Sequence, residues 1–400
     1  MKILGIETSC DETALCVLEC ASKSTSLKFK ILGEKIGSQV KIHEKFGGVF
    51  PSLAKREHQK NLVPLLKITL KKAGLLKKEK KTKKELTKEK IKGLRQILTR
   101  EPLLLKNLEK FLLQYQKPKI NYLALTVGPG LEPCLWVGVN FAKALAFFWN
   151  LEIIPLNHLE AHFVSGLFKI INQSPSLKIA DFFPALGLIV SGGHTQLILA
   201  KKIGSYKILG ETRDDAAGEC FDKTARILGL NFPGGPELEK LAKKSKNSGA
   251  FRIKLPRPMI QNKSFDFSFS GLKTAVLYHW LKQPKEIKES LEYKRALAKE
   301  IQKAVIEVLV RKTLRAAKIF PLKSIIVAGG VSANQELRKS FIKEVKKIKE
   351  KIQLLFPPPK LCTDNAIMIS FLGCLKKNQK IKDFNKIKAL ANLKITEKIK

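Results

Sequence analysis

The sequence has few acidic side chains, and this shortage dominates its charge. Only 35 Asp and Glu stand against 75 Lys and Arg, which gives a formal net charge of +40 and a pI near 10.0. Such a charge is typical of proteins that bind polyanions. Lysine carries most of it, however, and an AT-rich genome would also produce a lysine-rich chain. Composition therefore leaves a nucleic-acid partner and a genomic bias equally open.

Cysteine is also sparse, and its pattern argues against two classes of small domain. The seven cysteines are odd in number and contain no C-x-x-C pair. A disulfide framework or a zinc ribbon is therefore not expected, and a reducing cytoplasm is the predicted location. An acidic residue, Glu7, falls where a signal peptide would have its apolar region, so secretion is not expected.

Long hydrophobic runs and the common nucleotide-binding fingerprints are missing as well. The longest charge-free run of near-membrane length, 182–200, is interrupted by the polar turn 191–196, so we predict two buried strands around a turn. Neither G-x-x-x-x-G-K-[ST] nor G-x-G-x-x-G occurs, which removes support for a P-loop or a Rossmann dinucleotide site.

What the chain does have is enough apolar material for two domains. Hydrophobic residues make up 44% of the 400 positions, including 22 Phe. Apolar runs flank a polar turn at 3–18 and again at 185–200, which predicts two similar hairpins and a duplicated domain plan. A third buried strand is expected at 324–328, and helical periodicity is strong at 216–228, 271–281 and 291–317. Strands alternating with helices indicate the α/β class.

Two segments concentrate the positive charge. Residues 76–119 carry 15 Lys or Arg against five Glu, with apolar residues at helical intervals from Leu94 to Leu113, so we predict a basic helical insertion. Residues 376–400 carry nine Lys against two acids and are expected to form a basic tail. Either could contact RNA backbone, but such runs are more often simply solvated faces.

The pair His158 and His162 has the spacing of metal ligands on one face of a helix. Spacing alone leaves a metal pair and two unrelated histidines equally open. A zinc protease of the H-E-x-x-H type would need an acid directly after the first histidine, whereas Glu160 lies about 200° around the helix. A third ligand would be an acid such as Asp364, although a helix N-cap is the more ordinary role for Asp364 or Thr363.

Three glycine turns in the second half suggest a site for a nucleotide. They lie at 191–194, 232–236 and 329–334, where backbone N–H groups can approach an anion. Next to them, Asp222 is placed to reach such a site, while Asp214 and Asp215 are expected to cap a helix and Cys220 to be a structural thiol.

With these motifs assembled, the chain resembles the TsaD/Gcp family, the tRNA N6-adenosine threonylcarbamoyltransferases, once called O-sialoglycoprotein endopeptidases. The resemblance runs from Ile3 to about Leu375. It rests on Gly5-Ile-Glu-Thr-Ser-Cys-Asp-Glu-Thr13, Gly47-Gly-Val-Phe-Pro-Ser52, Gly128-Pro-Gly-Leu131, His158-Leu-Glu-Ala-His162, Val190-Ser-Gly-Gly-His-Thr-Gln196, Asp214-Asp-Ala-Ala-Gly-Glu-Cys-Phe-Asp-Lys-Thr224, Phe232-Pro-Gly-Gly-Pro236, Asp266-Phe-Ser-Phe-Ser-Gly-Leu-Lys273, Gly329-Gly-Val-Ser-Ala-Asn334 and Cys362-Thr-Asp-Asn365.

The resemblance implies a fold of two ribonuclease-H-like domains of the actin/Hsp70/sugar-kinase (ASKHA) type around a nucleotide cleft. We expect an N-terminal domain at 1–156 with the insertion at about 76–119, a C-terminal domain at 157–375, and the tail at 376–400. The resemblance also implies one divalent metal ion, Fe2+ in preference to Zn2+, and an active-site acid, Glu12. The implied metal ligands are His158, His162 and Asp364. The implied binding residues for the substrate adenylate are Ile189, Val190, Ser191, Gly192, Gly193, Asp222, Gly235 and Asn334.

The reaction implied is transfer of a threonylcarbamoyl group from L-threonylcarbamoyladenylate to N6 of the adenosine 3′ of the anticodon, in tRNAs reading codons that begin with A. The implied partners are tRNA, an inactive ASKHA paralogue and a small P-loop ATPase, with no membrane. Two alternatives remain: a metal-dependent endopeptidase, and an ATP-dependent kinase or chaperone of the same fold. A non-catalytic scaffold is disfavoured because the complete His/His/Asp set is present.

Overall fold

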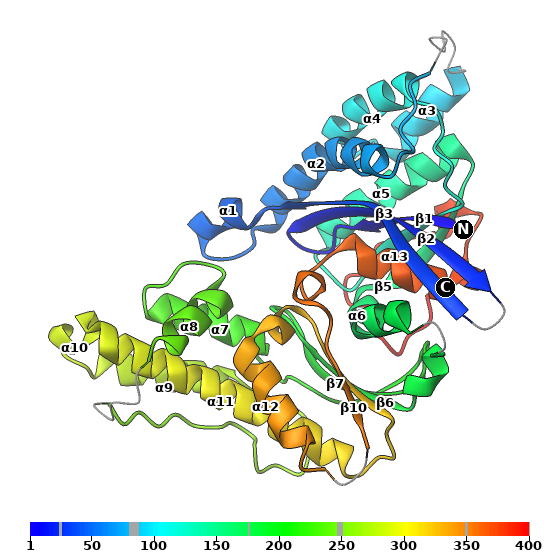
Figure 1. Ribbon diagram of the computed structural model, residues 1–400. Coiled ribbons are helices and arrows are strands. Elements are labelled where there is room, and N and C mark those ends of the chain that lie inside the picture. Colours follow the sequence, from blue (N-terminus) through cyan, green and yellow to red (C-terminus); the bar gives the residue numbers. More distant parts are fainter. Residues whose placement is uncertain (24–25, 80–87, 175–176, 246–250, 349–350, 400) are drawn as a thin grey trace. The chain divides into compact units, whose positions relative to one another are not determined.

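The computed structural model describes residues 1–23, 26–79, 88–174, 177–245, 251–348 and 351–399 (Figure 1). The chain forms two compact units. The first consists of Met1–Lys41, Val49–Lys178 and Asp364–Lys400, and the second of Ile42–Gly48 and Ile179–Thr363. Short α1 (Val40–His43) and η1 (Glu44–Phe46) lie where the chain first passes between them.

The first unit is built on a five-stranded sheet with the order β3-β2-β1-β4-β5. Its strands are β1 (Lys2–Glu7), β2 (Glu12–Lys23), β3 (Ser26–Ser38), β4 (Tyr122–Gly128) and β5 (Glu152–Asn157). The first three pair antiparallel, whereas β4 is parallel to β1 and β5 is parallel to β4. The hairpin predicted at 3–18 is confirmed as β1 and β2.

Helices cover both faces of this sheet, as Figure 1 shows. They are α2 (Pro51–Lys72), α3 (Lys88–Ile97), α4 (Pro102–Gln114), α5 (Glu132–Trp149), α6 (His158–Gln173) and α13 (Ala366–Leu375). Because side chains alternate along β1, Leu4 and Ile6 pack in the core formed with α2 and α5, while Gly5 lies against α13. A Cβ at Gly5 would overlap Ser370, so this glycine allows α13 to approach the sheet closely.

The second unit repeats the same sheet plan with the order β10-β9-β6-β7-β8. Its strands are β6 (Ala185–Val190), β7 (Thr195–Lys202), β8 (Ser205–Glu211), β9 (Ser324–Ala328) and β10 (Gln353–Leu355). Again three strands pair antiparallel and two follow in parallel. The strands expected at 185–200 and at 324–328 are therefore confirmed, and so is the duplicated ribonuclease-H-like plan of the α/β class.

The helices of the second unit pack on its sheet around a core of apolar side chains from β6, β9, α7, α11 and α12. They are α7 (Ala217–Ile227), α8 (Gly234–Lys243), α9 (Ser270–Leu281), α10 (Lys285–Glu289), α11 (Leu291–Ala317) and α12 (Gln335–Val345), with short turns η2 (Ile179–Phe182), η3 (Gly330–Ala333) and η4 (Pro359–Leu361). The three helices predicted from periodicity are confirmed as α7, α9 and α11. None of the helices in the described part of the chain is both long and apolar enough to span a membrane.

The boundaries of the units differ from those expected at 156/157 and 375/376. The first unit also contains α6 and α13, because α13 packs against β1, β2 and α6. Contacts with a sheet made mostly of earlier strands decide where these late helices belong, and such contacts are not visible in the order of motifs along the chain.

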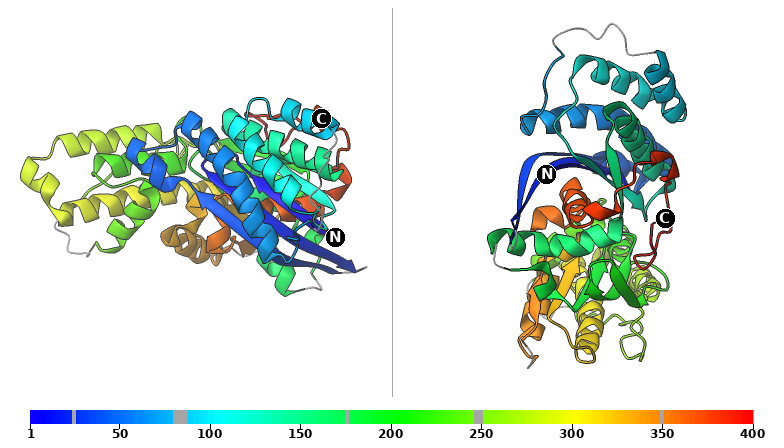
Figure 2. Two further views of the ribbon diagram at one scale, coloured as in Figure 1. Left: turned by 90° about the horizontal axis from the view of Figure 1, so that it is seen from above. Right: turned by 90° about the vertical axis from the view of Figure 1, so that its right-hand side faces the viewer.

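The C-terminal segment 376–400 is not a separate basic tail, because its described residues pack on the first unit. It contains η5 (Lys377–Gln379) and η6 (Phe384–Lys386) and buries Ile387, Leu393 and Ile395. The backbone N–H of Leu390 donates to the carbonyl of Val127 at 2.7 Å. In Figure 2 this red segment lies beside the helices of the first unit, in agreement with the contact of Phe384 with Phe147 of α5.

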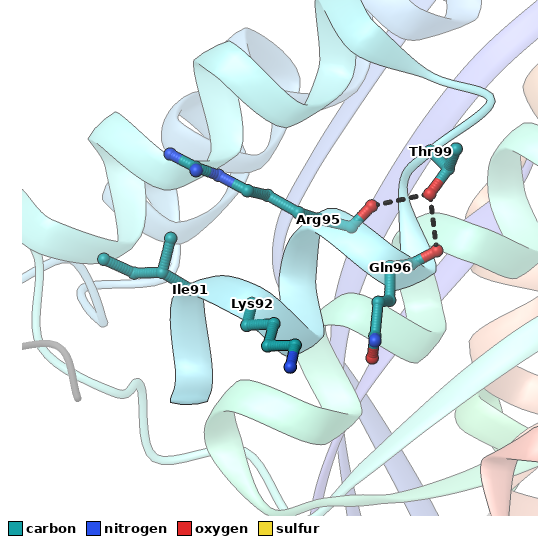
Figure 3. A pocket seen from close by; sticks show the side chains of 5 residues that line it. All are labelled: Ile91, Lys92, Arg95, Gln96 and Thr99. Atoms are coloured by element: carbon teal, nitrogen blue, oxygen red, sulfur yellow. Dashed lines mark hydrogen bonds between the residues drawn. The ribbon is translucent and has the colours of Figure 1, made fainter. Parts of the chain in front are cut away.

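The basic insertion contains two helices, α3 and α4, as predicted, but Lys78 and Tyr115 at its ends form an isolated antiparallel bridge. The lysine run at 77–92 lies partly outside the described residues. Leu94 and Leu98 anchor α3 in the core of the first unit. Its outer surface borders a hollow of about 530 Å³, lined by Ile91, Lys92, Arg95, Gln96 and Thr99 (Figure 3). The Thr99 hydroxyl donates back to the carbonyls of Arg95 and Gln96, and closes the end of the helix.

The structure contains one disulfide that the cysteine pattern did not predict. Cys20 of β2 and Cys374 of α13 form a disulfide with a Cα–Cα distance of 6.6 Å. These residues are 354 positions apart, and no sequence pattern predicts their pairing, because only the packing of α13 on the sheet brings them together. Cys10, Cys16, Cys134, Cys220 and Cys362 are free thiols.

We predict that the C-terminal segment contributes directly to the stability of the first unit. Leu393→Ala removes a buried side chain and is expected to lower the free energy of unfolding by about 2–4 kcal/mol, measured by urea denaturation. Thr396→Ala, at an exposed position of the same segment, is the control. Equal stability of the two variants would contradict the observed packing.

Candidate functional site

Two histidines lie side by side at the start of α6. The helix begins at His158, and its N-cap Asn157 accepts hydrogen bonds from the N–H groups of Leu159 and Glu160 at 2.9 and 3.1 Å. One helical turn separates His158 from His162, so both rings project from the same face. Their ring centroids are 4.6 Å apart and the rings are nearly perpendicular.

Asp364 joins the two histidines from the loop before α13. Its Oδ1 lies 2.9 Å from His162 Nε2 and 3.4 Å from His158 Nε2. The N-cap of α13 is the next residue, Asn365, whose side chain accepts from the Met368 N–H at 3.0 Å. The capping role that the sequence favoured for Asp364 is therefore wrong, and its carboxylate is available to the histidines.

The structure thus brings together the three residues expected to bind a metal. One ligand atom from each of His158, His162 and Asp364 lies within 4.8 Å of the others. Two imidazole nitrogens and a carboxylate oxygen suit a borderline divalent ion such as Fe2+ or Zn2+. All three residues belong to the first unit.

A second carboxylate, Glu7, lies behind His158 and was not singled out from the sequence. It ends β1, is completely buried, and places Oε2 at 3.0 Å from His158 Nδ1. The signal that could have found it is an acid in an otherwise apolar strand, because a buried carboxylate needs hydrogen-bond partners. Its partners cannot be read from the sequence, since they lie on other elements.

The carboxylates of Glu7 and Asp364 favour a positive charge on or next to the His158 ring. Burial alone would lower the pKa of His158, but the carboxylates of Asp364 and Glu7 outweigh it and hold that pKa well above its usual range. Burial would likewise raise the pKa of Asp364, but His158 and His162 hold it well below the usual value. A proton or a metal ion at the imidazoles can supply this positive charge.

Glu12 starts β2, in the same unit. Burial, together with the carboxyl groups of Asp11 and Asp364, raises its pKa to about 10. This shift favours the protonated carboxyl, which does not act as a base. It could do so only if a nearby positive charge offset the neighbouring acids.

The side chain of Glu160, the acid between the two histidines in the sequence, is directed to Lys376. Its carboxylate pairs with Lys376 and is buried. It is therefore not placed as the general base of an H-E-x-x-H protease, in agreement with its position around the helix. The endopeptidase alternative gains no support from this geometry.

In the second unit, the turn after β6 presents its backbone in an open conformation. Ser191 N–H donates to the His194 carbonyl at 2.8 Å, and His194 N–H donates to Ser191 Oγ at 3.1 Å. A Cβ built at Gly192 or Gly193 would meet no heavy atom within 4 Å. Ile189 and Val190 are buried strand residues, so only their backbone can serve a ligand.

Close approaches hold this turn against its neighbours in the second unit. Gly329, at the end of β9, has φ +90° and leaves no room for a Cβ next to the Val190 carbonyl. This glycine is required both by its left-handed conformation and by the close approach. Gly218 N–H donates to the Ser191 carbonyl at 3.1 Å.

The remaining predicted binding residues have structural contacts of their own. Asp222 of α7 accepts from the Gly234 N–H at 2.7 Å. Burial raises the pKa of Asp222, while the N–H groups of Gly234 and Gly235 oppose this rise. Asn334 caps α12 by accepting from the Leu337 N–H at 2.9 Å, and it donates to Gln302 Oε1 at 2.9 Å.

The acidic start of α7 differs from expectation. Its N-cap is Ala216, not Asp214 or Asp215. Asp214 instead accepts from the N–H groups of Phe269 and Ser270 and from two serine hydroxyls, and thereby holds the start of α9. Asp215 pairs with Lys223 at 2.6 Å. Cys220 is a buried thiol whose pKa burial raises to about 12, which agrees with a structural role.

Comparison with known proteins decides which family these motifs represent. The family model for TsaD, described as tRNA N6-adenosine threonylcarbamoyltransferase, matches residues 30–81 and 102–371. The chain belongs to this family. The match is interrupted between residues 81 and 102, so the internal segment outside the family pattern is 82–101, shorter than the insertion expected at 76–119. Helix α3 lies within it and α4 does not.

Curated relatives with the family's name are similar in sequence to this chain over most of their own length. The tRNA N6-adenosine threonylcarbamoyltransferase of Persephonella marina is 39% identical over 93% of this chain and 89% of its own. Its namesake in Thermosipho africanus is 38% identical over 99% of this chain and 100% of its own. That of Dictyoglomus turgidum is 41% identical over 93% and 92%.

Among solved structures, the similarity in sequence is much lower. Component A of the Acidaminococcus fermentans (R)-2-hydroxyglutaryl-CoA dehydratase is 13% identical with a TM-score of 0.45, and covers 93% of this chain and 95% of its own. Full-length HypF is 11% identical with a TM-score of 0.47, and covers 98% of this chain and 56% of its own.

We predict that Asn365 stabilises the helix that follows Asp364. Asn365→Ala removes the bond to the Met368 N–H and is expected to lower the free energy of unfolding by about 1 kcal/mol. Asn365→Asp keeps a capping oxygen and is expected to lose much less. Chemical denaturation measures both, and an equal loss in the two variants would contradict the capping role.

Proposed function

We propose that the protein transfers the threonylcarbamoyl group from L-threonylcarbamoyladenylate to N6 of the adenosine 3′ of the anticodon, in tRNAs reading codons that begin with A, and releases AMP. Family membership is the observation that carries this proposal, since relatives with this name are similar along almost the whole chain. The endopeptidase and kinase alternatives have no specific observation in their favour.

The reaction sets a clear chemical demand. The exocyclic N6 amine is a poor nucleophile because its lone pair is delocalised into the ring. The enzyme must therefore make the carbamoyl carbonyl more electrophilic and stabilise the departing AMP. Positioned backbone N–H groups and a bound cation are suited to these tasks, and no covalent enzyme intermediate is needed.

One divalent ion, Fe2+ in preference to Zn2+, is proposed to bind His158, His162 and Asp364. The donor set fits such an ion, and the buried carboxylates beside the imidazoles favour a positive charge. Such an ion supplies Lewis-acid polarisation of a carbonyl or phosphoryl oxygen. The protein's own contribution is to hold the three ligand atoms together through the capped starts of α6 and α13.

The adenylate is proposed to bind the second unit at the backbone of 189–193 and near Asp222, Gly235 and Asn334. The open face of Gly192 and Gly193 supports a close approach of an anion to their N–H groups. Asp222 would act through the turn at Gly234 and Gly235, which it already orients. Glu12 is proposed as an acid of the active site whose protonation depends on the charge near Asp364.

The proposed partners are tRNA, an inactive paralogue of the same fold and a small P-loop ATPase, in the cytoplasm. The charge of +40 supports a polyanionic substrate. Helix α3 adds exposed Lys92 and Arg95 outside the family pattern, although Arg95 already pairs with Glu109 at 3.4 Å. None of the proposed site residues lies in 82–101, so we expect transfer at saturating tRNA to survive deletion of this segment.

The proposal predicts that modification of tRNA and bound metal are lost together. In cells whose only copy carries His162→Ala or Asp364→Ala, N6-threonylcarbamoyladenosine in tRNA is expected to fall at least tenfold by mass spectrometry of nucleosides, because metal-ligand loss removes the polarising ion. The purified variants are expected to lose most of about one equivalent of metal. His279→Ala is the matched control and keeps both. Unchanged modification in His162→Ala would contradict the proposal.

A second prediction separates adenylate binding from the metal. Gly193→Val places a side chain in the open space where the adenylate is proposed to approach, so affinity for the adenylate is expected to fall at least tenfold, measured by calorimetry. Metal content is expected to stay the same. Gly271→Val, at another glycine with open space, is the control. Unchanged affinity would remove this turn from the site.

A further inference from the structure

Glu7 is held by donors from three parts of the first unit. Its Oε1 accepts from the Ser9 N–H at 2.6 Å, and its Oε2 accepts from the Thr126 hydroxyl at 2.6 Å. His158 Nδ1 also lies 3.0 Å from Oε2. The carboxylate is completely buried, and its position is determined by β1, β4 and α6.

This arrangement determines which nitrogen of His158 carries the proton. A carboxylate that already accepts from Ser9 and Thr126 can only accept from Nδ1, so Nδ1 must donate. In a neutral ring, Nε2 then keeps its lone pair. Nε2 is the nitrogen that lies 3.4 Å from Asp364, on the side where the three ligand atoms converge.

The second histidine lacks such support. His162 Nδ1 is buried and has no hydrogen-bond partner among the described residues. Its Nε2 is oriented by Asp364 alone, at 2.9 Å. The two proposed ligands are therefore not equivalent, because only the ring of His158 is oriented from both sides.

We infer that Glu7 is a positioning residue, which holds His158 in the Nδ1–H tautomer and so presents Nε2 as a metal ligand. This inference rests on the proposed metal site and extends it to a residue that touches neither substrate nor metal. Carboxylates in this relation to a ligating imidazole typically change metal affinity about 10–100-fold when removed.

The substitution Glu7→Gln tests this inference because it changes hydrogen bonding without changing shape. A glutamine has a single acceptor oxygen. If its NH2 replaces Oε1, it faces the Ser9 N–H, donor against donor. If it replaces Oε2, it donates to His158 Nδ1 and forces the other tautomer, with a proton on Nε2. The Ser9 backbone N–H cannot turn away, so the second orientation, which removes the Nδ1–H tautomer of His158, is the one we expect.

The experiment titrates the full-length, metal-stripped protein with Zn2+ against a chromophoric chelator. Glu7→Gln is expected to raise the Kd for Zn2+ roughly 10–100-fold. Glu160→Gln is the matched control, because Glu160 is also buried but pairs with Lys376. The Kd of this variant for Zn2+ is expected to change less than about twofold. Nitrogen-15 NMR of the metal-stripped protein, at a pH at which the His158 ring is neutral, is expected to show an Nδ1–H for His158 that is lost in Glu7→Gln.

Three results would overturn the inference: an unchanged Zn2+ affinity in Glu7→Gln, an equal loss in Glu160→Gln, or an unchanged His158 tautomer. Thr126→Val, which keeps the charge of Glu7 and removes one of its donors, provides a second test if Glu7→Gln fails to fold. It is expected to weaken Zn2+ binding less than Glu7→Gln, and no weakening would count against the inference. His162→Ala separates the two proposals. If it retains full Zn2+ affinity, the ligand set itself is wrong; if it loses affinity while Glu7→Gln does not, only the role of Glu7 fails.

Discussion

Two carboxylates lie next to the same imidazole in the first unit, Glu7 fully buried and Asp364 half-buried, and their pairing with it is the constraint on which the site depends. Glu7 and Asp364 lie on opposite sides of His158, at 3.0 and 3.4 Å from its two nitrogens. Removing carboxylates from water costs several kcal/mol each unless they are paired. The end of β1, the start of α6 and the loop before α13 must therefore keep their relative positions. Each of them supplies one of the charges or one of their hydrogen bonds.

The two units share one sheet plan but contribute different chemistry. In the first, the ends of β1 and β5 place Glu7 and His158, and the chain returns late to add Asp364 and α13. The C-terminal segment supports this arrangement, since Asn157, the cap of α6, donates to the carbonyls of Leu393 and Lys394. In the second unit, the corresponding strand end at Val190 leads into an open glycine turn. A duplicated fold thus provides a charged side-chain cluster in one unit and an open glycine turn in the other.

The sequence predicted the elements and the ligand candidates better than their contacts. Both hairpins and the main helices follow from apolar periodicity, which depends only on near neighbours. The choice between Asp364 and Asn365 as helix cap depends on backbone direction at one residue, and three polar residues in a row make that choice ambiguous. Two of the three partners of Glu7, Thr126 and His158, are 119 and 151 positions away, so no local pattern predicts them. In the C-terminal segment, the many lysines suggest an exposed tail, although Ile387, Leu393 and Ile395 are buried.

The central claim is that threonylcarbamoyl transfer needs one divalent ion at His158, His162 and Asp364. The most direct test is to titrate metal-stripped, full-length protein with Fe2+ and to measure transfer to tRNA in the presence of its partner proteins. The account predicts that the rate rises with added ion and levels off at about one equivalent per chain. Full activity of the stripped protein, with no response to added Fe2+ or Zn2+, would contradict it.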